Sequence, residues 1–202
     1  MRYHMNKGGT ACKTDVLWMQ SFFHGGDGMQ IELVKLSDAD ALQRYEAACQ
    51  KAQETDILPF RCRYADMNSF LKAQIDWHNS RHLPKGIVPS SLYVCKQEGE
   101  IVGTLLLRHE LNPFLRQYIG HIGYRVHPLY RKQGIASEML QQAVILAKQE
   151  YGLPAVMVSC RSDNIASRKT IEHAGGIWER RYQVPETNEA FDIFWIGGNE
   201  ND

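Results

Sequence analysis

The order of apolar and polar residues along this chain changes its period from segment to segment, and each period predicts an element. Residues 29–37 alternate between apolar and polar positions, which is typical of a strand. A serine–aspartate pair then offers an N-cap to an alanine-rich helical stretch over residues 39–53. A second helix is predicted over residues 65–79. The clearest helix is residues 134–151, where apolar side chains recur at three- and four-residue spacing.

Strands are predicted in the middle and in the last third of the chain. Residues 91–96 and 100–108 form a hairpin around the turn Glu98-Gly99. The apolar run Leu105–Leu107 predicts that the second of these strands is buried on both faces and central in its sheet. The remaining predictions are strands at 117–126, 155–159, 177–184 and 191–196, and a helix that starts at Asp163-Asn164 and ends at Gly175-Gly176.

Strands and helices are therefore mixed along the chain from residue 29 onward, in the approximate order β-α-α-β-β-β-α-β-α-β-β. One hairpin meander is followed by strand–helix–strand crossovers. This order predicts an α/β fold with a mixed sheet, and it excludes an all-β fold and a helix bundle.

Composition limits the classes of protein to which the chain can belong. Its 202 residues fit one domain with a short appendage, and 23 basic side chains balance 23 acidic ones. A formal net charge of zero argues against a strong, non-specific nucleic-acid binder, so no nucleic-acid partner is expected. No apolar run approaches the roughly 18 residues of a spanning helix, so no membrane span is expected.

The cysteines indicate the redox environment. There are five of them, widely spaced, and no C-x-x-C pair occurs. We therefore expect reduced thiols, a cytoplasmic location and no metal site. Each cysteine is interpreted first as a small buried hydrophobe.

Residues 1–28 differ from the rest of the chain, because they carry no sustained period of either kind. They end in a Gly-Gly-Asp-Gly run, and the strand pattern begins at once at Met29. Two interpretations are open: residues 1–28 are an N-terminal arm, or they lie upstream of a true start at Met29. Mass analysis of the N-terminus of the protein made in its own host would decide between them.

One segment combines features that favour anion binding. A strand ends near Val126, a short basic turn with Arg131 and Lys132 follows, and a helix begins at Gly134. The first turn of a helix has unpaired N–H groups and a partial positive charge, and a glycine lets a ligand approach the backbone. These features suit a phosphate or pyrophosphate. A solvated basic turn with a glycine at a tight bend explains the same residues, and neither a Walker loop nor a dinucleotide fingerprint occurs.

The same segment carries a family resemblance. Residues 131–136 (RKQGIA) match the [QR]-x-x-G-x-[GA] signature of the GNAT N-acetyltransferase superfamily. The helix from Asn164 to the glycine pair at 175–176 resembles the second cofactor motif of that family. With the order of strands, the resemblance covers about residues 29–196. The runs 107–112 and 120–124 look like a subgroup of bacterial predicted acetyltransferases.

The resemblance implies a mixed, mostly antiparallel sheet of about six to seven strands, flanked by about four helices, with a splayed central strand pair. It implies one N-acetyltransferase domain over residues 29–198 and a tail at 199–202. Acetyl-CoA is implied as cosubstrate, its pantetheine on the backbone of the strand end and its pyrophosphate on the amides of the signature loop. The cofactor-binding residues so implied are Val126, Arg131, Lys132, Gln133, Gly134, Ile135, Ala136, Ser137, Asn164 and Ser167. For Asn164, a plain N-cap explains the residue as well as ligand contact does.

The reaction implied is direct transfer of an acetyl group to a primary amine, of a small molecule or a peptide, in a ternary complex. The amine must lose a proton, the thioester oxygen must be stabilised, and the leaving thiolate benefits from a proton donor. Many family members carry a tyrosine where this chain has Ile171. We therefore name His121 and Tyr124 as candidate catalytic residues. Further candidates are His109, His127 and, acting through water, Glu110. Positioning alone is another route to activity.

Two other functions stay open. One is a non-catalytic acyl-CoA-binding or regulatory domain, which Ile171 permits. The other is an unrelated α/β domain whose basic turn binds phosphate or nothing. The acceptor side would be formed by segment 39–90. Its acidic residues would suit a cationic amine, but for any one of them a solvated helical face is the favoured interpretation. The residues of this segment that could line the acceptor side are Asp56, Asp66, Asp76, Trp77, His78 and His82.

A homodimer is compatible with the family, and nothing in the sequence requires one.

Overall fold

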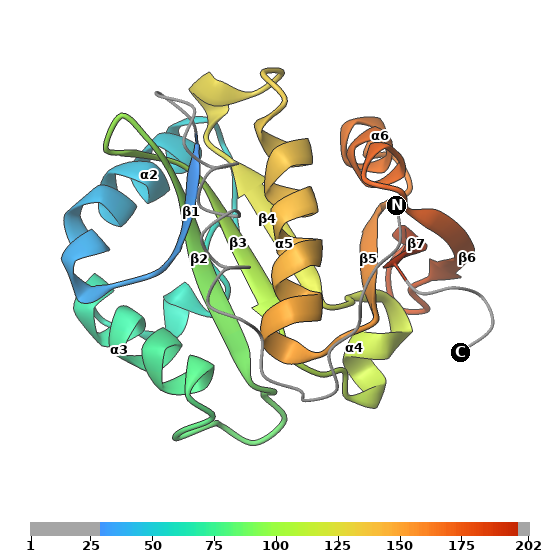
Figure 1. Cartoon of the computed structure of the whole chain (residues 1–202), viewed down its shortest axis with the longest axis horizontal. Coiled ribbons are helices and arrows are strands. Elements are labelled where there is room, and N and C mark those ends of the chain that lie inside the picture. Colours follow the sequence, from blue (N-terminus) through green and yellow to red (C-terminus); the bar gives the residue numbers. More distant parts are fainter. Residues whose placement is uncertain (1–28, 198–202) are drawn as a thin grey trace, which may run out of the picture.

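A computed structural model describes residues 29–197, which form one twisted sheet with helices on both of its faces (Figure 1). The strands are β1 (Gln30–Leu33), β2 (Ser90–Gln97), β3 (Glu100–Arg108), β4 (Ile122–Val126), β5 (Ala155–Arg161), β6 (Ile177–Gln183) and β7 (Ala190–Gly197). The helices are α2 (Ala39–Lys51), α3 (Met67–His78), α4 (Pro113–Tyr118), α5 (Ile135–Tyr151) and α6 (Ile165–His173). Three short 3₁₀ turns are η1 (Leu36–Asp38), η2 (Arg61–Arg63) and η3 (Pro128–Tyr130).

The sheet has seven strands in the order β1-β2-β3-β4-β5-β7-β6, and its neighbouring strands are antiparallel except for β4 and β5. The parallel pair is joined in register only at Ile122 opposite Val158. Beyond that point the described residues of β4 and β5 share no ladder pair, so the sheet is open at its centre. The predicted α/β fold with a mixed, mostly antiparallel sheet and a splayed central pair is confirmed.

Two apolar cores fill the two faces of the sheet. One lies under α5 and α6 and includes Leu105 and Met139, and the other lies under α2 and α3 and includes Leu106 and Phe70. Leu105, Leu106 and Leu107 of β3 alternate between these cores, which is the consequence of the two-residue period of a strand. The prediction from the run Leu105–Leu107 is therefore confirmed: β3 is buried on both faces and lies between β2 and β4.

Helix α5 crosses the sheet beside its open centre (Figure 1). It begins directly after Gly134 and ends before Gly152, and both glycines have a positive φ, at 83° and 64°. The helix packs closely on β3 because Gly103 has no side chain. A Cβ at Gly103 would lie 2.7 Å from Sδ of Met139. The predicted helix over 134–151 is confirmed to within one residue.

The predicted strand over 117–126 is wrong in its first part. Asn112 caps a helix there, since its Oδ1 accepts a hydrogen bond from the amide of Leu115 at 2.9 Å, and Pro113 occupies the first turn. The resulting helix, α4, runs to Tyr118, and β4 begins only at Ile122. The described residues therefore contain five helices where the resemblance implied about four.

The remaining elements lie within a few residues of their predicted positions. The predictions about residues 1–28 and about the tail at 199–202 lie outside the described residues, and the domain boundaries stay predictions. Across residues 29–197, no helix has both the length and the apolar character needed to span a membrane.

Candidate active site

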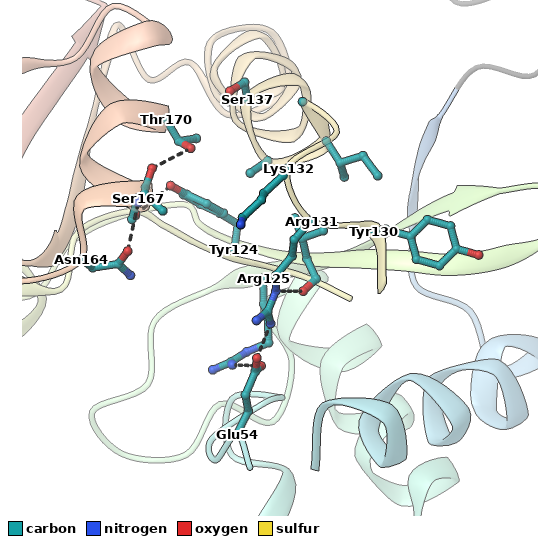
Figure 2. Close-up of a pocket in the computed structure, with 15 residues that line it drawn as sticks. Glu54, Tyr124, Arg125, Tyr130, Arg131, Lys132, Ser137, Asn164, Ser167 and Thr170 are labelled. Carbon is teal, nitrogen blue, oxygen red and sulfur yellow. Dashed lines mark hydrogen bonds and ion pairs between the residues drawn. The ribbon is translucent and has the colours of Figure 1, made fainter. Parts of the chain in front are cut away.

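A pocket of about 770 Å³ lies where β4 and β5 separate (Figure 2). The carboxyl ends of these two parallel strands and the amino ends of α5 and α6 meet at this edge, which is the usual place for a ligand in an open α/β sheet. Its lining residues are Glu54, Tyr124, Arg125, Val126, Tyr130, Arg131, Lys132, Gly134, Ile135, Ala136, Ser137, Asn164, Ala166, Ser167 and Thr170.

The loop before α5 presents backbone amides to this pocket. Lys132 and Gly134 both have a positive φ, at 62° and 83°, so the chain turns sharply into the helix. The amides of Ser137 and Glu138 donate to the carbonyl of Gly134, which leaves the earlier amides of the first turn without intrahelical acceptors. A Cβ at Gly134 would meet no atom within 4 Å, so the space beside this backbone is open to a ligand.

Nine of the ten predicted cofactor-binding residues line this pocket, although they come from β4, the loop before α5, the first turn of α5, and α6 with its N-cap. Gln133 is the exception. Its side chain is exposed, and its Nε2 donates to the carbonyl of Leu129 at 3.3 Å. The structure thus brings together the signature loop and the second motif, which are separated by α5 and β5 in the sequence.

Asn164 acts as the N-cap of α6. Its Oδ1 accepts a hydrogen bond from the amide of Ser167 at 3.0 Å, and the same side chain lies at the rim of the pocket. The N-cap interpretation of Asn164 is confirmed, and its contact with a cofactor stays a prediction.

Tyr124 lies in the pocket, and its hydroxyl is 2.9 Å from Oγ of Ser167. Burial raises the pKa of this phenol above its usual value, so the hydroxyl keeps its proton near neutral pH. Ile171, at the position where relatives carry a tyrosine, is fully buried in the core under α6. The phenol that lies next to α6 in this pocket therefore comes from β4.

His121 lies outside the pocket, just before β4. Its Nδ1 accepts a hydrogen bond from the amide of Met157 at 2.9 Å, and its own amide donates to the carbonyl of Met157 at 2.7 Å. Burial, with a smaller effect from Arg108 and Arg116, lowers the pKa of His121 to about 4. The ring is neutral at pH 7 and joins β4 to β5, so its place favours a structural role over a catalytic one.

The other catalytic candidates also lie outside the pocket. His109 is stacked on Tyr151, and its Nε2 lies 2.8 Å from Oγ of Ser91, at the far end of α5. The Nδ1 of His127 accepts from the amide of Leu129 at 3.2 Å. Glu110 is exposed and is not among the lining residues.

The six side chains singled out between residues 39 and 90 do not line the pocket. Asp66 caps α3 by accepting from the amide of Ser69 at 2.7 Å, and Trp77 is buried against Phe60. The residue of this segment that does reach the pocket is Glu54, which no pattern in the sequence distinguishes. Glu54 forms ion pairs with Arg125 and Arg131, 71 and 77 positions away.

The sequence profile of the acetyltransferase (GNAT) family matches residues 50–175, which include α3, the signature loop and α6. The chain belongs to the GNAT acetyltransferase family. It is therefore an N-acetyltransferase that uses acetyl-CoA. No curated protein sequence matches the chain significantly.

Solved structures of GNAT acetyltransferases share the fold. RimL, a ribosomal L7/L12 alpha-N-protein acetyltransferase in complex with coenzyme A, has a TM-score of 0.64 and 18% identity, over 84% of this chain and 93% of that one. RimJ of Mycobacterium smegmatis, with a CoA-disulfide, has a TM-score of 0.65 and 21% identity, over 86% and 83%. YncA of Salmonella typhimurium, with acetyl-CoA, has a TM-score of 0.59 and 17% identity, over 86% and 95%. At these identities the likeness shows the fold.

Proposed function

We propose that this acetyltransferase transfers the acetyl group of acetyl-CoA directly to a primary amine, with both substrates bound at once. The observation that carries the proposal is the joint placement of the open helix turn at Gly134 and the Tyr124–Ser167 pair in one pocket at the gap between β4 and β5. Acetyl-CoA supplies an activated acetyl thioester, and the chain supplies binding, orientation and a proton.

The first turn of α5 is proposed to hold the pyrophosphate. Its free amides point along the helix axis, where the helix dipole adds a partial positive charge. Lys132, which is exposed and lines the pocket, adds a mobile cation beside them. These groups place the nucleotide end of the cosubstrate at α5 and direct its pantetheine arm into the gap between the strands.

Tyr124 is proposed to donate the proton that the departing thiolate takes up. Its raised pKa keeps the phenol protonated, and Oγ of Ser167, 2.9 Å away, is proposed to donate to the phenol oxygen, which leaves the phenol proton free for transfer. The described lining residues include one carboxylate, Glu54, which is paired with two arginines. We therefore propose that water, instead of a lining carboxylate, takes the proton from the attacking amine.

The acceptor class proposed is an amine of a small molecule or a peptide. One structural neighbour, from Salmonella typhimurium, modifies the N-terminal serine of ribosomal protein L7/L12, which supports an amino-terminal acceptor. Ile171 is buried and carries no proton donor, so turnover by this enzyme is proposed to rest on Tyr124. Release of free thiol from acetyl-CoA in the presence of an amine tests for this turnover.

The proposal is tested by calorimetric titration of acetyl-CoA into the protein and into Gly134→Glu. The carboxylate of the variant would occupy the open space and repel the pyrophosphate, so we expect binding to weaken at least about 100-fold. Gly86→Glu is the matched control. Gly86 also has a positive φ, 84°, and a Cβ there would meet no atom within 4 Å, so the variant carries the same backbone strain outside the pocket. Failure of the folded wild-type protein to bind acetyl-CoA would contradict the proposal.

A further inference from the structure

The pocket proposed for an anionic cosubstrate contains a carboxylate. Glu54 is the one acidic side chain among the lining residues, and 16% of it is exposed. Both of its oxygens are occupied: Oε2 accepts from Arg125 and Oε1 accepts from Arg131 (Figure 2). The two guanidinium groups hold the pKa of Glu54 below its usual value, so the carboxylate is charged at pH 7.

Arg131, the first residue of the signature loop, is turned toward Glu54. Its Nε donates to the carbonyl of Val126 at 3.1 Å, and its Nη2 donates to Glu54. In Figure 2 the side chains of Arg131 and Arg125 converge on Glu54, whereas Ser137 lies on the opposite side of the view. The guanidinium of Arg131 is therefore paired with a carboxylate of the protein itself, that of Glu54.

Glu54 belongs to the segment between α2 and η2, which lies on the other face of the sheet. Its amide donates to the carbonyl of Cys49 at 3.1 Å, and Ile57 and Leu58 are buried in the core under α2 and α3. The carbonyl of Thr55 also accepts from Arg125 at 3.1 Å. The segment is thus held by its own core and by Arg125, independently of Arg131.

We infer that Glu54 is a positioning residue that acts through Arg131 and competes with the phosphates of acetyl-CoA for this guanidinium. The inference rests on the proposed function, because it assumes that acetyl-CoA binds at the first turn of α5. A phosphate offers more charge than a carboxylate and can accept two hydrogen bonds from one guanidinium, whereas Glu54 accepts one from Arg131, donated by Nη2. When Arg131 turns to the phosphate, Arg125 remains to neutralise Glu54, so the exchange leaves no carboxylate unpaired.

The proposed competition and a purely structural role predict opposite changes in the affinity for acetyl-CoA when Glu54 is replaced. A residue that merely held the pocket together would weaken cosubstrate binding when it was changed. A competitor would strengthen binding, and only for ligands that carry phosphate. Glu54→Gln removes the charge and keeps the shape and one hydrogen-bond acceptor, so it separates these two effects.

The experiment is calorimetric titration of wild type and Glu54→Gln with acetyl-CoA and, separately, with acetylpantetheine, which has the same thioester arm and no phosphate. We expect Glu54→Gln to bind acetyl-CoA about twofold to fivefold more tightly, the range set by one partly exposed ion pair. Binding of acetylpantetheine should be the same in both proteins. Glu98→Gln, an exposed change of the same kind in the β2–β3 turn, should leave both titrations unchanged.

Each outcome decides between defined alternatives. Equal or weaker binding of acetyl-CoA by a folded Glu54→Gln would overturn the role of Glu54 and leave the proposed function intact. Equal tightening for both ligands would also overturn it, since phosphate would not be the competitor. If wild type and variant both fail to bind acetyl-CoA, the proposed function itself fails. Thermal unfolding of each variant shows whether it is folded.

Discussion

Tyr124 gains its proposed role from its surroundings, since its residue type alone does not distinguish it from other tyrosines of the chain. It projects from β4 into the pocket, where burial keeps the phenol protonated and its hydroxyl lies 2.9 Å from Oγ of Ser167. The helix position that carries a tyrosine in many relatives is filled by Ile171, which packs in the core. The proton donor proposed for this protein is therefore placed on a strand, and Ile171 of α6 has no group that could take this role.

Replacing Tyr124 by phenylalanine removes the proton donor and keeps the ring. We expect the amine-dependent release of thiol from acetyl-CoA to slow by about 100-fold, the size of a general-acid contribution, with acetyl-CoA affinity nearly unchanged. The measurement is a thiol-release assay with a panel of free amino acids, polyamines and serine-initiated peptides. Tyr182→Phe, whose ring stacks on Tyr118 outside the pocket, is the control. An undiminished rate in Tyr124→Phe would show that the proton takes another path.

Some residues of the site can be predicted from the sequence and others cannot. The loop residues 131–137 follow one another along the chain, so a strand, a basic turn, a glycine and a helix start favour an anion site there, and all of these residues except Gln133 line the pocket. Glu54 is different, because its partners Arg125 and Arg131 are 71 and 77 positions away. A contact across such a distance leaves no period or spacing in one sequence. His121 is a candidate by its chemistry, and only its place beside Met157 shows that its lone pair is used.

Among the elements, α5 can be predicted and α4 cannot, for related physical reasons. Helix α5 has 17 residues and repeats its apolar spacing often enough to be recognised. Helix α4 has six residues, too few to establish a period, and its only signal is the cap Asn112 followed by proline. That pair is equally common in turns, so the sequence favours a turn before a strand.

Changing Asn112 to alanine tests the account of α4. The side chain accepts from the amide of Leu115 at 2.9 Å and donates to the carbonyl of Gly86 at 3.1 Å. Loss of such a cap costs about 1 kcal/mol, so we expect the free energy of unfolding in urea to fall by about this amount. Asn112→Asp keeps the cap acceptor and should recover most of the loss. A destabilisation that is equal in both variants would show that the contact with Gly86 matters instead of the cap.

For the molecule as a whole, the buried histidines make stability depend on pH. Burial lowers the pKa of both His121 and His109 to about 4, whereas an unfolded chain has histidine pKa values of about 6.5. Between these two values the unfolded state binds more protons than the folded state. The free energy of unfolding therefore falls as the pH is lowered through this window. Above the window, the stability that depends on the neutral buried rings is fully present.

We expect about 2 kcal/mol of this loss between pH 7 and pH 5 to come from His121, the more deeply buried ring. The measurement is urea unfolding at about pH 7 and about pH 5. His121→Asn keeps an oxygen that can accept from the amide of Met157 and removes the titration, so its stability should vary less with pH. A wild-type protein equally stable at both values would contradict the expectation.

The opening between β4 and β5 has a further consequence for the kinds of molecule that this fold can recognise. A sheet ordinarily shows unpaired edges only at its rim, and here it has two facing edges at its centre. Such edges accept any extended chain whose amides repeat at strand spacing. We therefore expect pantetheine, with its two amide groups, and a short stretch of peptide to compete for this gap. Extended peptidomimetics without a nucleotide should therefore bind in the gap between β4 and β5 and inhibit the enzyme. The spacing of their amide groups would decide how well they fit this gap.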